Sequence, residues 1–197
     1  RTIGSLSNGR LSFTATPTGA THLAWNGLSI TRWHPDLTTD SSGSALYLRN
    51  RRNGEHHIPT EFPLFEGGSS STALFAEDSV LFHRTENRVT SSVENRISPE
   101  SDAWVQTVTV RNLSGRSLDL DVTSVAELAL GRPADDDAHP AFSKMFVRTE
   151  FRDGMLVATR KRRSDSDPAV WVAQFVTGPE DTQSVGPHPD EPLRVET

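Results

Sequence analysis

The sequence predicts an all-β protein, specifically an antiparallel β-sandwich, because apolar and polar residues alternate along it and turn-forming dipeptides separate the alternating runs. Alternation with a period of two puts one side of a strand on a core and the other in water. No segment keeps a convincing helical period. The residues that share one face of an expected strand are Val80 and Phe82; Val89, Ser91, Val93, Asn95 and Ile97; Trp104, Val108 and Val110; and Leu118, Leu120 and Val122.

The turn signals support hairpins between neighbouring strands. Such dipeptides tolerate the positive φ angles that tight hairpin turns require, and a succession of local hairpins favours a sandwich over a parallel α/β sheet. The expected turns are Asn26-Gly27, Asn53-Gly54 and Asp153-Gly154, with Asn8-Gly9 and Ser114-Gly115 as two more.

The length of 197 residues suits one domain. We expect the sandwich to occupy residues 1–176. Residues 177–197 are expected to form a loop or a frayed terminus, because Thr177–Glu196 contains four Pro and two Gly among acidic residues. The chain begins at Arg1 without a Met, which we interpret as a fragment of a longer protein.

Composition bears on the class of function. The net charge of −6 disfavours broad binding to nucleic acid, and no run approaches the roughly 18 apolar residues of a membrane span, so no direct membrane contact is expected. The absence of Cys suits a reducing compartment, hence a cytoplasmic location. The basic cluster Arg160–Arg163 is followed at once by acidic residues and is interpreted as a solvated loop with local charge balance.

A candidate carbohydrate-binding site begins at Arg32 and Trp33. An aromatic ring can receive the apolar face of a sugar, while guanidinium and carboxylate groups bind its hydroxyls. An alternative is that Trp33 caps the core while Arg32 and Asp36 close a loop by an ion pair. The residues proposed for this site are Arg32, Trp33, Asp36, Asp40, Tyr47 and Arg49.

A second candidate segment follows the acidic run Asp135-Asp136-Asp137. Carboxylates and a histidine could hold a hard cation, but consecutive Asp side chains cannot all point inward, so no metal and no cofactor are expected. The preferred interpretation is that the acidic run is a solvated turn, that Pro140 fixes the chain, and that two Phe side chains anchor the segment in the core. The residues of this segment are His139, Pro140, Phe142, Ser143 and Phe146.

The other histidines show no metal-ligand spacing, and no Gly-x-Ser-x-Gly nucleophile turn is present, although a Ser–His–Asp arrangement stays open. No catalytic residue is assigned. The histidines outside the two candidate segments, which contain His34 and His139, are His22, His56, His57, His83 and His188.

In the order and spacing of several segments, the sequence resembles cyclic β-1,2-glucan synthases and glycoside phosphorylases of the cellobiose phosphorylase type, which form glycoside hydrolase family 94, formerly glycosyltransferase family 36. In one departure, Ser42 precedes Gly43 where relatives usually have Trp. The segments that carry the resemblance are Leu6–Arg10, Gly27–Trp33, Tyr47–Arg49, Val108–Asn112, His139–Phe151 and Leu156–Arg160.

The resemblance implies an N-terminal sandwich of the galactose-mutarotase-like supersandwich type, truncated here at its C-terminal end. In such proteins it precedes a helical barrel that holds the catalytic acid. The implied role is a non-catalytic domain that supports the barrel and lends a loop near residues 32–40 to the glucan site or to a dimer interface. The implied partners are a β-glucan oligosaccharide, the barrel and a second copy of the chain. The parent is either a soluble phosphorylase or a synthase at the inner membrane.

Two alternatives are an autonomous carbohydrate-binding module and an aldose epimerase. The module needs an exposed aromatic platform, and we expect Trp104 and Trp171 to be buried because they lie in strand-like segments. An epimerase needs His residues and a carboxylate base around one sugar ring, for which the scattered histidines offer no motif.

Overall fold

The computed structural model describes residues 3–33, 43–63, 70–165 and 167–178. The chain divides into two compact units, residues 1–128 and residues 129–197. The expected boundary at residue 176 stays a prediction, since most of the tail lies outside the described residues.

The first sheet of the first unit is an antiparallel meander. Strands β1 to β4 pair in chain order, and alternate residues of β2 (Leu11, Phe13 and Ala15) are buried. The β3–β4 turn has φ 47° at Asn26 and 79° at Gly27, as the dipeptide predicts. The bounds are β1 Gly4–Ser7, β2 Leu11–Ala15, β3 Thr21–Trp25 and β4 Leu28–Thr31.

The second sheet has the order β10-β9-β8-β7 and is also antiparallel. Alternation in burial along β8, β9 and β10 follows the predicted faces. The β8–β9 turn was not predicted: Asn87 and Arg88 both have positive φ without a glycine. The bounds are β7 Ser70–Phe75, β8 Val80–Glu86, β9 Val89–Ile97 and β10 Trp104–Asn112.

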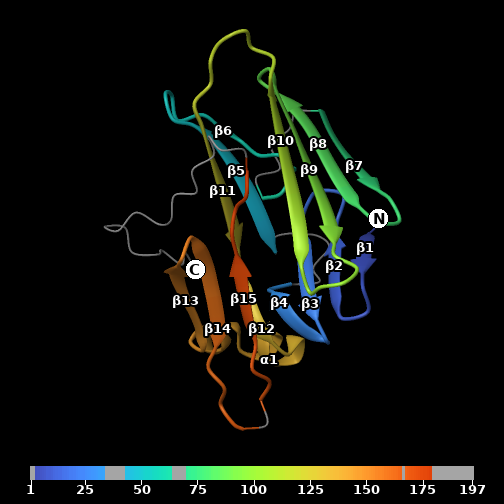
Figure 1. Cartoon of the computed structure of the whole chain (residues 1–197), viewed down its shortest axis with the longest axis vertical. Helices are drawn as coiled ribbons and strands as arrows, with labels where there is room; N and C mark the ends of the chain where they lie inside the picture. Colours follow the sequence, from blue (N-terminus) through green and yellow to red (C-terminus); the bar gives the residue numbers. More distant parts are fainter. Residues whose placement is uncertain (1–2, 34–42, 64–69, 166, 179–197) are drawn as a thin grey trace. The chain divides into compact units, whose positions relative to one another are not determined.

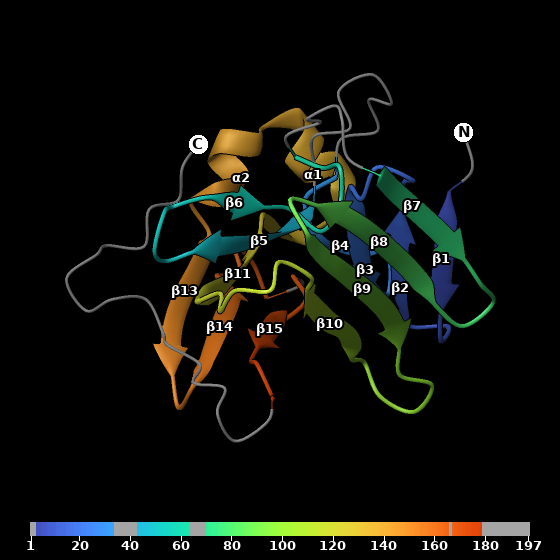
Figure 2. The same ribbon diagram turned by 90° about the horizontal axis from the view of Figure 1, so that it is seen from above.

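These two sheets pack face to face within the first unit, and Figures 1 and 2 show β8 and β9 (green) alongside β1 and β2 (blue). The ring of Phe13 stacks on Trp104 with centroids 5.3 Å apart. The antiparallel sandwich expected from the sequence is therefore confirmed. Core side chains from both sheets include Leu6, Leu11, Phe13, Val80, Phe82 and Val93.

A third sheet has the order β11-β5-β6. The expected burial of Val122 is wrong: it pairs with the fully buried Leu48 but is itself 55% exposed. Within the described part of the chain β11 pairs only with β5. Its apolar side chains therefore have a neighbouring strand along one edge of β11 only. The bounds are β5 Ser44–Asn50, β6 His56–His57 and β11 Leu120–Ala126.

The second unit combines short helices with a three-stranded antiparallel sheet of order β13-β14-β15. Its β13–β14 turn, Asp153-Gly154, has the predicted positive φ angles. Strand β12, Leu128–Gly131, begins at the last residue of the first unit and continues into the second. The bounds of the other elements are α1 Pro133–Ala138, α2 Pro140–Lys144, β13 Val147–Arg152, β14 Met155–Arg160 and β15 Trp171–Gln174.

The two helices correct the expectation of strands and a solvated turn in this region. A Pro opens each helix, where its fixed φ suits the first turn and its missing N–H is harmless. Asp135 and Asp136 lie in the first turn of α1, near the positive end of the helix dipole, and Asp136 is buried. In the described part of the chain, no helix is long and apolar enough to cross a membrane.

Candidate functional site

Glu127 joins the two ends of the segment 33–42. The main-chain N–H of Arg32 donates to its carbonyl oxygen at 2.7 Å, and Arg32 Nη1 donates to its Oε1 at 2.6 Å. Its own N–H donates to the carbonyl of Gly43 at 3.2 Å. One residue therefore links Arg32 and Gly43, the described residues that flank the segment singled out by the sequence.

Gly43 meets a steric demand at this base. A Cβ at this position would lie 1.9 Å from the main-chain oxygen of Thr21, and φ is +113°. Next to it, the Ser44 N–H donates to Thr21 Oγ1 at 3.1 Å, and the two hydroxyls are 2.8 Å apart. The start of β5 is thus held against β3 by contacts that only a glycine allows.

Trp33 lies beside His22 on β3. The ring centroids are 5.7 Å apart and the planes are tilted, which leaves Trp33 half-buried. His22 Nε2 is hydrogen bonded to Ser29 Oγ at 3.1 Å, and burial lowers the pKa of His22. The indole ring therefore lies beside an imidazole whose protonation is disfavoured by burial.

Tyr47 and Arg49 lie on the outer face of β5, opposite the buried Leu46 and Leu48. Tyr47 is half-buried and Arg49 is exposed. Across the ladder, Thr123 pairs with Tyr47 and Asp121 pairs with Arg49, so hydroxyl, guanidinium and carboxylate groups share one surface.

The predicted carbohydrate-binding residues are therefore spread along the fold. Arg49 lies five residues beyond Ser44, which places it roughly 16 Å along the strand from the loop base. Arg32 is only 2% exposed, with its guanidinium directed to Glu127. Asp36 and Asp40 lie outside the described residues, so a shared sugar site stays a prediction.

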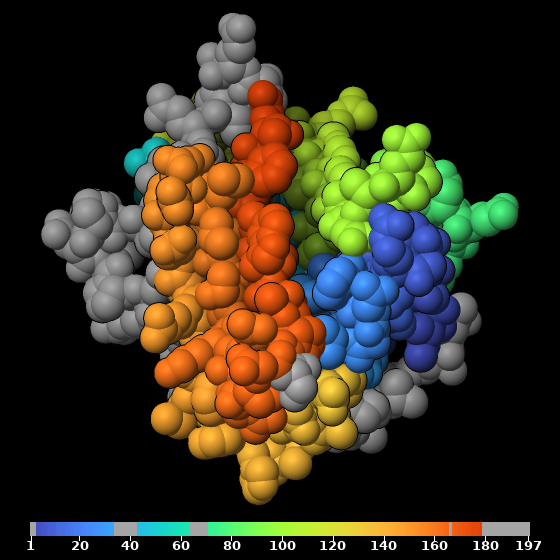
Figure 3. Space-filling model, turned by 60° about the horizontal axis from the view of Figure 1, so that its bottom comes forward, coloured from blue at the N-terminus to red at the C-terminus, as the bar shows by residue number. Residues whose placement is uncertain are grey.

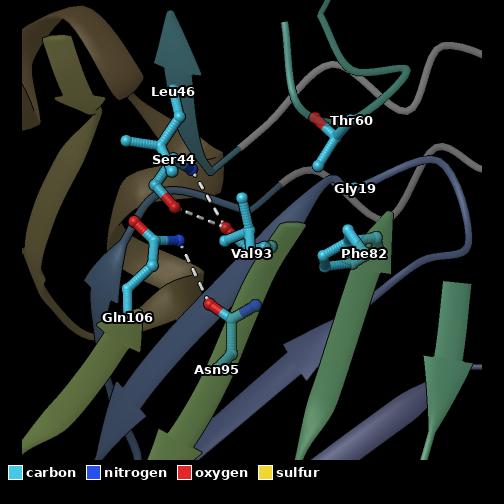
Figure 4. A pocket seen from close by; sticks show the side chains of 9 residues that line it. Gly19, Ser44, Leu46, Thr60, Phe82, Val93, Asn95 and Gln106 are labelled. Atoms are coloured by element: carbon cyan, nitrogen blue, oxygen red, sulfur yellow. Dashed lines mark hydrogen bonds between the residues drawn. The ribbon is translucent and has the colours of Figure 1, made fainter. Parts of the chain in front are cut away.

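A small cavity lies near this base, inside the first unit (Figure 4). Its volume of ≈ 10 Å³ suits roughly one water molecule, not a sugar. Gln106 Nε2 donates to Asn95 Oδ1 at 3.1 Å on one side of it. The lining residues are Gly19, Thr21, Ser44, Leu46, Thr60, Phe82, Val93, Asn95 and Gln106.

Ser91, His57 and Glu86 lie next to one another in the order of a hydrolase triad, but the buried Nδ1 of His57 makes no hydrogen bond to a described residue. His57 Nε2 lies 2.7 Å from Ser91 Oγ, and its Nδ1 lies 3.2 Å from Glu86 Oε2. Ser91, however, is 0% exposed, so no substrate carbonyl can reach its hydroxyl. Burial lowers the pKa of His57, Glu86 opposes that shift and Arg84 adds to it.

Arg84 shows what this buried cluster does. Its Nη1 donates to the main-chain carbonyls of Ile58 and Thr60, and its Nη2 lies 3.3 Å from Glu86 Oε1. Because the guanidinium is 2% exposed, these contacts replace the hydration of its two terminal nitrogens, whereas its buried Nε has no hydrogen-bond partner among the described residues. The cluster holds the segment after β6 against β8 and β9.

The second candidate segment is built around Arg160. The interpretation of Arg160–Arg163 as a solvated loop is wrong for Arg160, which ends β14 and is half-buried. Arg160 Nη1 donates to the carbonyls of Ala129 and Ser143, at 2.9 and 3.1 Å, and to Ser143 Oγ at 3.2 Å. Its guanidinium also lies 5.5 Å from the ring centre of Phe146. Burial is the main cause that lowers the pKa of Arg160.

The remaining motif residues have structural positions. His139 lies between α1 and α2, and Pro140 opens α2. The expected anchoring of Phe142 in the core is wrong: it is 51% exposed and touches Phe146 edge-on at 5.1 Å, because α2 directs it outward. Among the described residues, no three His, Asp or Glu side chains gather as metal ligands.

Sequence reasoning missed Glu127 at the first site. Its signal was present, since it is the one charged residue between Val125 and Leu130, an otherwise apolar run. A charged residue in an apolar run suggests an ion pair, and Arg32, 95 residues away along the chain, forms one with it.

Comparison with known proteins gives two findings. Residues 1–186 match the family described as glycosyl hydrolase 94, supersandwich domain. The chain is 38% identical over 174 residues to the cyclic β-(1,2)-glucan synthase NdvB of Rhizobium meliloti (strain 1021). This match covers 87% of the chain but 6% of the synthase, so the chain spans a small part of that relative's length.

Proposed function

Because the chain belongs to the glycosyl hydrolase 94 supersandwich-domain family, we propose that it is a non-catalytic, carbohydrate-associated domain that presents its segment 33–42 to a glucan-binding cleft. The resemblance found in the sequence and the β-sandwich class are both confirmed. The observation that carries the proposal is the closure of that segment at Glu127.

Closure at the base favours a binding loop for an entropic reason. A loop with fixed ends has fewer conformations to lose when a ligand orders it, so less of the interaction free energy is spent on ordering. Trp33 stands at the entry of the loop, where its ring could receive the apolar face of a sugar. Asp36 and Asp40 lie within the loop sequence and would accept hydrogen bonds from hydroxyls.

We assign the chemistry to a separate helical domain. In inverting phosphorolysis a carboxylic acid protonates the glycosidic oxygen while phosphate attacks the anomeric carbon from the opposite face. The Ser91–His57–Glu86 cluster supports a non-catalytic role for this chain, because its hydroxyl is enclosed. The supersandwich then acts by shaping the cleft.

The strand β11 is the proposed contact surface for the helical domain or for a second copy of the chain. Val122 and Val125 are 55% and 49% exposed and lie on opposite sides of this strand. Exposed apolar side chains along a strand with one described neighbour support association with another surface.

The test uses a protein that carries this chain together with its helical domain. Replacing Trp33 with Ala should lower kcat/KM for β-1,2-glucan phosphorolysis at least tenfold, because an aromatic contact with the sugar is lost. Arg111→Ala, an exposed change on β10, is the matched control and should leave kcat/KM unchanged. Unchanged kinetics in Trp33→Ala and in a variant with both Asp36 and Asp40 replaced by Ala would contradict the proposed loop.

A further inference from the structure

Trp171 differs from the other three tryptophans in being 69% exposed, contrary to the burial expected from the sequence. Trp25 Nε1 donates to Asp102 at 2.7 Å, Trp33 lies beside His22, and Trp104 stacks on Phe13. Met145, Phe175 and Val176 of the same unit are exposed to a similar degree, so exposure alone does not mark a site, and the neighbours of Trp171 on the sheet decide what its ring can bind.

The register of β13, β14 and β15 separates the two faces of the sheet. One face carries the mainly apolar side chains Val147, Phe151, Leu156, Ala158 and Val172, and Ala158 is buried. The opposite face contains Arg148, Glu150 and Thr159, which are all exposed, and it also contains Trp171. Trp171 therefore lies on the side of the sheet with more exposed side chains, although Met155, Val157 and Ala173 on that side are half-buried.

Two cross-strand rows make up what we call the Trp171 face. Arg148, Thr159 and Trp171 form one row across the three strands, and Glu150, Val157 and Ala173 form the next. Thr159 and Ala173, the neighbours of Trp171 across and along the strand, are small, so the ring stands above them. The strands reach the surface of the molecule as a continuous band of orange to red in Figure 3.

We propose that the Trp171 face binds a neutral glucan oligosaccharide, as a second saccharide site separate from the segment 33–42. The ring of Trp171 receives the C–H face of a glucose unit. Arg148 donates to hydroxyl oxygens of the next unit, and Glu150 accepts from its hydroxyl groups. The ligand class rests on the proposed function, whereas the location rests on the exposure and register of these residues.

The charges of this face favour an uncharged, hydroxyl-rich ligand over other occupants. Arg148 and Glu150 cancel, and Arg152, the next residue on this side of β13, lies 3.4 Å from the carboxylate of Asp153, so the face offers donors and acceptors without a strong net field for a polyanion. The exposed Arg148 and Glu150 also disfavour a protein partner, because charged residues are depleted at the core of protein interfaces. A flat ring with planar polar groups across neighbouring strands suits the flat face of a sugar.

The test is a titration of the 197-residue chain with β-1,2- and β-1,4-linked gluco-oligosaccharides, followed by amide chemical shifts in NMR spectra. A single stacked ring predicts a dissociation constant of roughly millimolar strength. Trp171→Ala should weaken binding at least tenfold, Trp171→Phe less, and Arg148→Ala severalfold. Leu74→Ala removes a comparably exposed apolar side chain on β7 and should have no effect.

Each other outcome has a defined meaning. The proposal is overturned if no chemical shift changes at tens of millimolar oligosaccharide. It is also overturned if Trp171→Ala and Trp171→Phe bind the oligosaccharide as tightly as the original chain does. Loss of self-association or of contact with the helical domain in Trp171→Ala, with glucan binding intact, identifies a protein-docking face and also overturns it. Neither result bears on the function proposed for segment 33–42, which is tested by the kinetics of the longer protein.

Discussion

The guanidinium of Arg32, which is 2% exposed, donates a 2.6 Å hydrogen bond to Glu127, whose side chain is 41% exposed. The pair couples a buried cation to a carboxylate that solvent partly screens. Because Glu127 also binds the main chain of both Arg32 and Gly43, this contact positions the proposed loop and stabilises the unit at the same time.

Replacing Glu127 with Gln should lower the free energy of unfolding by about 2 kcal/mol, because a charged hydrogen bond to a buried guanidinium becomes a neutral one. Guanidinium chloride unfolding followed by tryptophan fluorescence measures the change. Glu100→Gln, at an exposed turn position, is the control and should stay within about 0.5 kcal/mol. Equal stability of the two variants would show that the Arg32–Glu127 pair contributes nothing.

Gly43→Ala should destabilise the chain by about 3 kcal/mol, because the new Cβ meets the Thr21 oxygen and the left-handed φ disfavours a side chain. Gly54→Ala separates the two causes. Gly54 also has a positive φ, +74°, but its Cβ would have no atom within 4 Å, so the expected loss is about 1 kcal/mol. Similar losses at both positions would show that the close approach at Gly43 relaxes freely.

Stability should fall as the pH drops below about 6.5, the ordinary pKa of histidine. Burial lowers the pKa of His57 and of His22 in the folded state, so the unfolded chain takes up protons first. The stabilisation is complete above the ordinary pKa and is lost as the pH falls towards the folded-state values, with a slope of at most about 1.4 kcal/mol per pH unit for each histidine.

Denaturant titrations of the chain between pH 8 and pH 5 test this dependence. His57→Gln should reduce the slope because it removes one of the two titrating histidines, the one that lies beside Glu86, Arg84 and Ser91. His56→Gln, next to it but exposed, is the matched control. A slope that is unaltered in His57→Gln would assign the pH dependence to other groups.

Arg160→Ala should destabilise the second unit by about 2 kcal/mol, since three acceptors from Ala129 and Ser143 lose their donor. Hydrogen exchange of the β14 amides measures the loss where it occurs. Arg162→Ala changes an exposed residue of the same basic cluster and should have little effect. Equal exchange in both variants would mean that Arg160 does not hold the motif segment in place.

Local features of the fold were predictable because local chemistry decides them. The faces of β9 and β10 follow from alternation, and the turns at Asn26-Gly27 and Asp153-Gly154 follow from residues that accept positive φ. The turn at Asn87-Arg88 lacks a glycine. Arg88 has a left-handed φ in the turn between the paired strands β8 and β9, and a residue with a side chain rarely adopts such an angle, so the sequence carried no signal for this turn.

The site was less predictable, because it depends on contacts between distant parts of the chain. Nothing near Arg32 in the sequence indicates that Glu127 will receive its guanidinium. Alternation placed Trp171 in a strand but could not say which face of that strand is covered. The helices after Gly131 are too short to show a period, and their evidence is a Pro at the start of each.

The most direct test of the central claim measures phosphate-dependent cleavage of β-1,2-gluco-oligosaccharides by the purified chain, alone and mixed with the helical domain. The account predicts no release of glucose 1-phosphate by the chain alone and release by the mixture, with a lower rate when the chain carries Trp33→Ala. Release of glucose 1-phosphate by the chain alone would contradict it.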